Sequence, residues 1–142
     1  MKTLLLDIDY TLFHENTPRP HLKDFLERMH SKYKIHFYTA GTQMRVTEAC
    51  RVLLHNLKMD SDFVRYMNRG ALTRENCKMI QLPSGAEIKC LKKAGEYLMT
   101  PVCELIMLDD NPSYDNPHVK QVIQAEGFMG ELNDDYLLRV TL

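Results

Sequence analysis

Two acidic residues come directly after an apolar segment near the start of the chain. Asp7 and Asp9 follow the apolar residues 3–6 and are separated by Ile8. In a β-strand, residues i and i+2 point to the same side, so both carboxylates can face one pocket while Ile8 packs away from it. A pair of carboxylates placed in this way is suited to nucleophilic and acid–base chemistry.

A hydroxyl and a second acidic pair follow two further apolar segments. Thr39 comes after residues 34–38, and Asp109 and Asp110 come after residues 102–108. Taken singly, each of these residues is typical of a turn or a helix cap. Acidic groups at several strand ends, with a hydroxyl and a nearby lysine, are the groups that phosphoryl transfer uses, so their joint placement favours that reaction.

The segments that must position these groups alternate between strand and helix patterns. Unbroken apolar runs are typical of buried parallel strands, and apolar stripes at i, i+3, i+4 and i+7 are typical of helices. The order predicts an α/β fold, a doubly wound (Rossmann-like) parallel sheet that binds ligands beyond the carboxyl ends of its strands. We expect strands at 3–8, 34–38 and 102–108, and helices over 22–29, 46–57, 91–98 and 116–124.

Residues 58–88 have few helix signals. Two apolar stretches, 63–67 and 77–82, are predicted as short strands, with a turn at Pro83-Ser84-Gly85. We interpret 58–88 as a substrate-facing insert that is too small to be a large cap domain. The length of 142 residues fits one domain, 1–142, with one core.

Composition narrows the class of protein. The apolar runs are too short to span a membrane, and no export signal is expected. The four cysteines form no CxxC pair and the six histidines are scattered, so we expect reduced thiols in a cytoplasmic or nuclear protein and no zinc site. Residues 58–93 carry eight Lys/Arg against four Asp/Glu, whereas residues 104–142 carry two against eight. The basic middle either faces an anionic ligand or is a solvated surface.

The joint pattern resembles the haloacid dehalogenase (HAD) superfamily of phosphatases. The matching residues are Asp7-Ile8-Asp9-Tyr10-Thr11, Thr39, Lys89 and Asp109-Asp110. Further stretches resemble one branch, the small C-terminal-domain (Fcp/Scp-type) protein phosphatases. They are 11–14, Arg19-Pro20-His21, 37–40, Arg74-Glu75-Asn76-Cys77 and 88–91.

The resemblance implies a magnesium-dependent phosphatase with an aspartyl-phosphate intermediate. Asp7 is then the nucleophile, and Asp9 is the general acid and base. Thr39 and the amides of Ala40 and Gly41 hold the phosphoryl oxygens, Lys89 offsets negative charge, and Arg74 contacts phosphate or substrate. Mg²⁺ is bound by Asp7, the backbone carbonyl of Asp9 and Asp110, with Asp109 acting through water or orienting the ligands.

The sequence departs from the Fcp/Scp branch in three places. Tyr10 stands where those enzymes usually have Glu or Gln, and Asp110 stands where they usually have Asn. The loop 12–20 is shorter than theirs, and the stretch 39–89 is longer. These differences leave the chemistry unchanged and bear on the substrate.

Three functional hypotheses follow. The first is a phosphatase for phosphoserine and phosphothreonine in proteins, with Arg65, Arg69 and Lys92 lining the approach to the pocket. The second is a small-molecule or phosphotyrosine phosphatase that resembles the magnesium-dependent phosphatase branch, which shares the Asp-x-Asp-Tyr-Thr start. The third is a non-enzymatic phospho-acceptor or pseudophosphatase, which the second acid, Asp9, argues against. A phosphoprotein or phosphopeptide is the expected partner, and neither direct nucleic-acid binding nor membrane association is expected.

Overall fold

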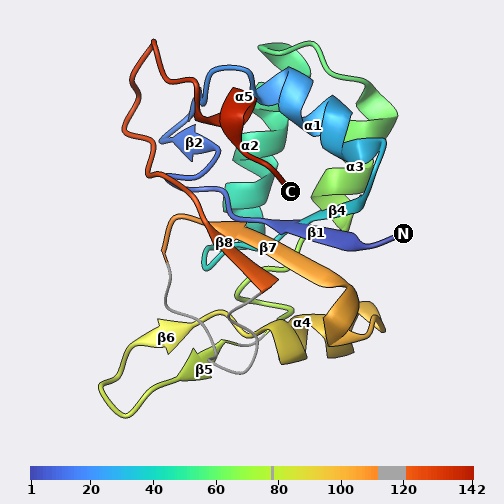
Figure 1. Cartoon of the computed structure of the whole chain (residues 1–142), viewed down its shortest axis with the longest axis vertical. Coiled ribbons are helices and arrows are strands. Elements are labelled where there is room, and N and C mark those ends of the chain that lie inside the picture. The colour runs from blue at the N-terminus through green and yellow to red at the C-terminus, as the bar shows by residue number, and fades with distance from the viewer. Residues whose placement is uncertain (78, 112–120) are drawn as a thin grey trace.

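A four-stranded parallel sheet forms the centre of the molecule, with the strand order β4-β1-β7-β8 (Figure 1). The computed structural model describes residues 1–77, 79–111 and 121–142. The strands of the sheet are β1 (Thr3–Leu6), β4 (Lys34–Phe37), β7 (Leu105–Asp109) and β8 (Val122–Gln124). In β1, Thr3 is in register with Lys34 of β4 and with Leu105 of β7. The predicted α/β fold with a parallel sheet is confirmed.

Helices cover both faces of this sheet (Figure 1). The helices on one side are α1 (Leu22–His30), α2 (Gln43–His55) and α3 (Ser61–Arg69), with the short α5 (Tyr136–Arg139) against α1. The other side carries α4 (Leu91–Leu98), which is followed by the 3-10 turn η1 (Val102–Glu104). The three predicted helix stripes at 22–29, 46–57 and 91–98 therefore correspond to α1, α2 and α4.

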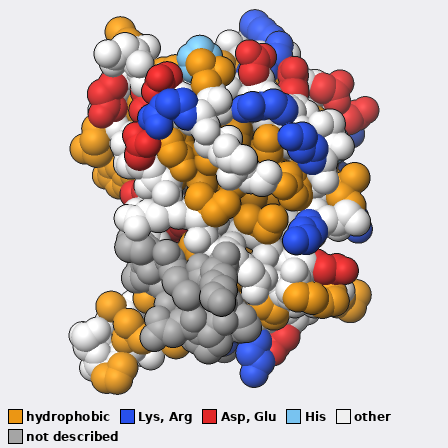
Figure 2. All heavy atoms as spheres, viewed as in Figure 1, with side chains coloured by type: hydrophobic (Ala, Val, Ile, Leu, Met, Phe, Trp, Pro, Cys, Tyr) orange, Lys and Arg blue, Asp and Glu red, His pale blue; other side chains and the backbone are white. Residues whose placement is uncertain are grey.

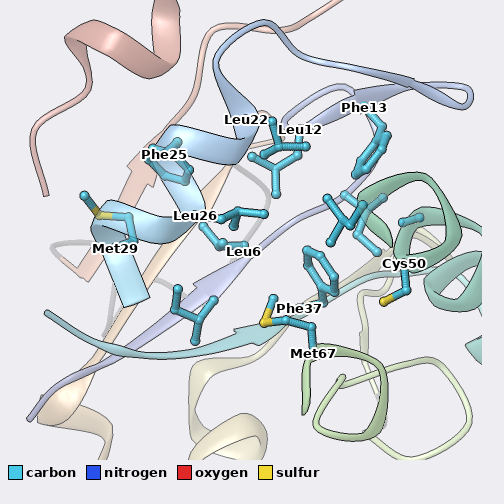
Figure 3. Close-up of a cluster of buried hydrophobic side chains, with 14 of the residues drawn as sticks. Leu6, Leu12, Phe13, Leu22, Phe25, Leu26, Met29, Phe37, Cys50 and Met67 are labelled. Carbon is cyan, nitrogen blue, oxygen red and sulfur yellow. The ribbon is translucent and has the colours of Figure 1, made fainter. Parts of the chain in front are cut away.

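The core has two parts because alternate residues of β1, an inner strand, point to opposite faces of the sheet. Leu4 and Leu6 pack with residues of α1, α2 and α3, whereas Leu5 packs with residues of α4. All three side chains are fully buried. Figure 3 shows the larger cluster, in which Phe25 and Leu26 of α1 lie on the same side of the sheet as Leu6.

Two small hairpins accompany the sheet. The first pairs β2 (Phe13–His14) with β3 (Thr17–Pro18), and the second pairs β5 (Ile80–Gln81) with β6 (Glu87–Ile88). The β5–β6 hairpin extends away from the sheet beside α4 (Figure 1). Its turn contains Gly85 at a φ of 89°, a left-handed conformation that glycine adopts without strain. The turn predicted at 83–85 is confirmed, and the strand predicted at 77–82 is reduced to β5.

The prediction of a strand at 63–67 is wrong, because this segment is part of helix α3. The carboxylate of Asp60 accepts a hydrogen bond from the Phe63 amide at 3.0 Å and caps the helix. Val64 and Met67 are buried at helical spacing, and Met67 lies beside Phe37 (Figure 3). A short apolar and aromatic run fits either period, and packing against α2 and β4 decides in favour of the helix here.

Two boundaries near the C-terminus also differ from the prediction. The helix predicted at 116–124 begins outside the described residues, and its end, Val122–Gln124, is strand β8. Ile123 pairs with Leu108 at the edge of the sheet. Strand β7 begins at Leu105, since the preceding residues form η1. A β-branched Val-Ile pair has a high strand propensity, which the Asn-Pro helix-start signal at 116–117 obscured.

Lys/Arg and Asp/Glu side chains are interspersed over the part of the surface formed by the helices (Figure 2). All four cysteines are unpaired, and three of them are buried. Among the described residues, no helix has both the length and the apolar character that crossing a bilayer requires.

Candidate active site

The acidic residues predicted from the sequence meet at the carboxyl edge of the sheet. Asp7 directly follows β1, Asp109 ends β7, and Thr39 lies two residues beyond β4. Because these strands are parallel neighbours, their ends converge around one open cavity of about 210 Å³. The cavity is lined by Asp7, Asp9, Tyr10, Thr39, Ala40, Met79, Glu87, Ile88, Lys89, Asp109, Asp110 and Asn111.

Lys89 links the two buried aspartates. Its Nζ lies 2.6 Å from Asp7 Oδ1 and 2.7 Å from Asp109 Oδ2. Burial by itself lowers the pKa of Lys89, but the charges of Asp7 and Asp109 outweigh it, so the pKa lies above its ordinary value. Lys89 is therefore a permanent cation at the centre of the site.

The junction that carries Lys89 is held by Tyr38, the residue that follows β4. The buried Tyr38 hydroxyl accepts a hydrogen bond from the Cys90 amide at 3.0 Å, and the Tyr38 ring lies 5.6 Å from Lys89 Nζ. Lys89 lies between β6 and α4 and is only 7% exposed. Lys89, which lies 82 residues after Asp7 in the chain, is thus held against Asp7 by these contacts with Tyr38.

Three carboxylates lie close together here, and Lys89 contacts two of them. Oxygen atoms of Asp7, Asp109 and Asp110 all lie within 4.8 Å of one another. Burial raises the pKa of Asp109 to about 7, although Lys89 opposes the shift. Burial also raises the pKa of Asp110 to about 6, and the hydrogen bonding and charge of Asp7 add to this shift. The excess of buried negative charge fits a hard divalent cation, whose preferred ligands are carboxylate oxygens.

Thr11 connects two of these carboxylates, and the sequence analysis gave it no role. Its Oγ1 lies 2.9 Å from Asp7 Oδ2 and 3.1 Å from Asp110 Oδ1, and it accepts a hydrogen bond from the Asp110 amide at 2.9 Å. A hydroxyl has one proton, so it donates to one carboxylate at a time. The position of Thr11 four residues after Asp7 was the signal available in the sequence.

Thr39 faces the same cavity and organises the loop that follows it. Thr39 is almost fully buried, and its Oγ1 accepts a hydrogen bond from the Gly41 amide at 3.0 Å. Its own amide is bonded to the carbonyl of Leu72 at 3.0 Å. Ala40 lines the cavity, whereas Gly41 is not among the lining residues. The structure thus brings Thr39 and Ala40 to the Asp7 cavity and places Gly41 in support of Thr39.

Asp9 is bound by a residue that the sequence analysis missed. Arg45 Nε lies 2.9 Å from Asp9 Oδ1, and the Asp9 side chain is 44% exposed. Arg45 comes from the first turn of α2, immediately after the Thr39 loop. No motif marks it in the sequence, because a basic residue near the start of a helix is most often solvated.

The remaining basic residues lie farther from the cavity. Arg74 Nε donates to the carbonyl of Ala40 at 2.9 Å, and Arg74 Nη2 lies 3.6 Å from Glu87 Oε2. Arg74 is nevertheless not among the residues that line the cavity. Arg65 and Arg69 line a separate hollow on α3. The structure therefore does not place Arg65, Arg69 or Lys92 in the wall of the Asp7 cavity.

Comparison with known proteins identifies the family. Residues 2–142 match the family described as NLI interacting factor-like phosphatase. The chain belongs to this family. This family is one of HAD-type phosphatases, so the predicted recognition is confirmed, and the enzyme class of the family, phosphoric monoester hydrolase, is the predicted one.

A solved structure supports the same fold. It is that of a variant of the fission yeast RNA polymerase II CTD phosphatase Fcp1 bound to beryllium fluoride. The match has a TM-score of 0.63 at 15% sequence identity, and it covers 89% of this chain and 42% of that chain. The chain therefore spans less than half of the length of that phosphatase. No curated protein sequence matches this chain.

Proposed function

We propose that the chain is a Mg²⁺-dependent phosphatase that transfers the phosphoryl group of its substrate to Asp7 and then hydrolyses the aspartyl phosphate. The observation that carries this proposal is the buried contact of Lys89 with Asp7 and Asp109, inside a cavity that also receives Thr39 and Asp9. A carboxylate nucleophile attacks a phosphate dianion only where positive charge offsets their repulsion.

The first step forms a bond between a carboxylate oxygen of Asp7 and phosphorus and breaks the bond from phosphorus to the leaving oxygen. Asp9 gives its proton to that oxygen, which departs as an alcohol or phenol. Lys89 offsets negative charge on Asp7 and on the phosphoryl group, and Thr39 with the Ala40 amide holds the phosphoryl oxygens.

The second step returns the enzyme to its starting state. A water molecule attacks phosphorus and gives its proton to the Asp9 carboxylate, the bond between Asp7 and phosphorus breaks, and inorganic phosphate leaves. Asp7, Asp110 and the backbone carbonyl of Asp9 would bind Mg²⁺, with Asp109 acting through water or orienting them. The ion would supply further positive charge beside the transferred phosphoryl group.

We propose phosphoserine and phosphothreonine in proteins as the substrates. The cavity is open, and the part of the 58–88 insert that reaches it is the short stretch 79–88 with the β5–β6 hairpin. The described part of the chain forms no large cap domain (Figure 1). An open cavity admits a side chain that is still attached to a folded protein or peptide, whereas enclosure suits small molecules.

The test of the chemistry is turnover of an aryl phosphate with and without Mg²⁺. Asp7→Asn abolishes turnover, since an amide is not a nucleophile here, and Asp9→Asn slows it by at least ~10²-fold. Asp24→Asn, on the exposed side of α1, is the matched control and keeps the parent rate. Near-normal turnover by Asp7→Asn contradicts the covalent mechanism.

The test of the substrate compares kcat/KM for phosphopeptides and sugar phosphates. Phosphopeptides are expected to be the better substrates, and the reverse result would favour the small-molecule alternative. The Arg65→Ala/Arg69→Ala double variant is the control, because these residues line a separate hollow and are expected to leave both values unchanged.

A further inference from the structure

Arg45 is bonded to the residue that we propose as the general acid and base, yet it does not reach the cavity. Its Nε lies 2.9 Å from Asp9 Oδ1, while Arg45 itself is absent from the cavity lining. Only 16% of the Arg45 side chain is exposed, against 44% for Asp9. The influence of Arg45 on the reaction must therefore pass through Asp9.

The guanidinium group is itself fixed by contacts on the far side from Asp9. It donates to Asn16 Oδ1 at 3.0 Å and to the carbonyl of Glu15 at 2.5 Å, both at the tip of the β2–β3 hairpin. It also lies 5.7 Å from the centre of the Phe13 ring. Because an arginine fork has several donors in a rigid plane, these contacts hold the orientation of the Nε–H group toward Asp9.

A half-exposed aspartate without such a partner exchanges between rotamers. In the structure, Arg45 donates to one carboxylate oxygen of Asp9, and no described residue forms a hydrogen bond or ion pair with the other oxygen, Oδ2. The bond thus selects one orientation of the carboxylate and leaves its second oxygen for proton transfer. Catalytic groups need this kind of support, because a displacement of about 1 Å costs on the order of 10²-fold in rate.

We propose that Arg45 is a positioning residue, which ties the Asp9 carboxylate to the β2–β3 hairpin and so presents its free oxygen to the leaving oxygen of the substrate. The inference rests on the proposed role of Asp9. It adds that the β2–β3 hairpin and the first turn of α2 together hold the Asp9 carboxylate in place. Loss of these contacts lowers kcat and leaves KM unchanged, since Arg45 does not line the cavity.

The experiment measures kcat, KM and thermal stability for Arg45→Ala, Asp9→Asn and their double variant, with an aryl phosphate and Mg²⁺. Arg45→Ala is expected to lower kcat by about 10-fold or more, up to the ~10²-fold that loss of a general acid costs. In the Asp9→Asn background the same substitution changes kcat less than about twofold, since residues acting as one unit are not additive. Arg51→Ala, an exposed arginine on the same helix, is the matched control and keeps the parent kcat.

Two milder variants separate positioning from folding. Arg45→Lys keeps the charge but not the fork, and Asn16→Ala removes one of the contacts that hold the guanidinium group. Both are expected to fold with the parent melting temperature and to show intermediate losses of kcat. A parent-like kcat in Arg45→Ala, or a full and additive loss in the Asp9→Asn background, overturns the inference. A rise in KM without a fall in kcat also overturns it, because it assigns Arg45 to substrate binding. If Asp9→Asn alone keeps the parent rate, it is the proposed role of Asp9 that fails.

Discussion

At the scale of single residues, three carboxylates in the site share one ammonium group and one hydroxyl as their partners. Lys89 contacts Asp7 and Asp109, and Thr11 contacts Asp7 and Asp110. Two of these four contacts orient the carboxylate of Asp7, because Lys89 binds one of its oxygens and Thr11 the other. The carboxylate that we propose as the nucleophile is therefore held at both oxygens.

Thr11 offers a sharp test of this arrangement. Thr11→Val keeps the shape of the side chain but removes the hydroxyl, so Asp7 loses a partner and the Asp110 amide is left unpaired. Hydrogen bonds to charged groups contribute about 1.5–3 kcal/mol, so kcat/KM for an aryl phosphate should fall by roughly 10- to 100-fold. Thr11→Ser restores the hydroxyl and most of the rate. Equal losses in the two variants would show that the methyl group, and not the hydroxyl, matters.

The proposed Mg²⁺ site is tested by thermal denaturation. A cation that binds the folded state stabilises it by mass action, so added Mg²⁺ is expected to raise the melting temperature of the parent protein. Asp110→Asn removes one of the three charges, and the upward shift should shrink at every Mg²⁺ concentration. Asp24→Asn is the control and keeps the full shift. A shift of the same size in Asp110→Asn would remove Asp110 from the ion site.

At the scale of elements, helix α3 closes the core over one side of the sheet. Its buried residues, Val64 and Met67, are separated by one helical turn, whereas in a strand Met67 would share a face with Phe63 and Arg65. Asp60 caps the helix and Gly70 follows its end. The segment therefore supports the sheet and takes no part in the wall of the Asp7 cavity.

The packing of α3 is tested by truncating its buried methionine. Met67 is fully buried and Met44, on α2, is 72% exposed, so the two form a matched pair. Met67→Ala is expected to lower the free energy of unfolding by about 2–5 kcal/mol, and Met44→Ala by less than about 0.5 kcal/mol. Urea denaturation measures both values. Similar small effects for the two variants would contradict the packing described for α3.

The sequence was most informative where a motif and a strand end coincide. Asp7, Asp9 and Thr39 were predicted from apolar runs that end in polar residues, and the structure brings all three to one cavity. Arg45 was missed because its importance depends on the hairpin tip folding back toward α2, a contact between segments that no local pattern records. The same limit applies to β8, whose strand conformation depends on pairing with β7 at the edge of the sheet.

At the scale of the whole molecule, Arg19 joins the hairpin region to the C-terminal segment. Its guanidinium group is fully buried and forms two hydrogen bonds with Asp134, at 2.8 and 3.0 Å. It also donates to the carbonyls of Thr11 and Glu126 and lies over the ring of Tyr136 at 4.5 Å. This residue therefore links the loop that carries Thr11 to a segment more than a hundred residues later in the chain.

The Arg19–Asp134 pair makes stability depend on pH in the acid range. Partial burial alone raises the pKa of Asp134, but the hydrogen bonds and charge of Arg19 outweigh it and hold the pKa below its ordinary value. Such a carboxylate stabilises the fold above its unfolded pKa of about 3.9, and this stabilisation is lost as the pH falls through the folded-state pKa.

Asp134→Asn is accordingly expected to destabilise the protein at neutral pH by about 3 kcal/mol, because it leaves a buried arginine without its counter-ion. The difference from the parent should begin to shrink as the pH falls below about 4, where the unfolded parent binds a proton at Asp134, and it should be lost once the pH has passed the lower pKa of the folded state. Denaturation across pH measures both values. A difference that is constant over the whole range would show that packing, and not charge, accounts for the effect.

The central claim is that Asp7 carries the phosphoryl group, and chemical trapping tests it most directly. Borohydride reduces an aspartyl phosphate to homoserine, which peptide mass spectrometry locates in the chain. With Mg²⁺ and an aryl phosphate present during the quench, we expect conversion at residue 7, and none in Asp7→Asn or without substrate. Conversion at Asp9, Asp109 or Asp110, or turnover with no converted residue, would contradict it.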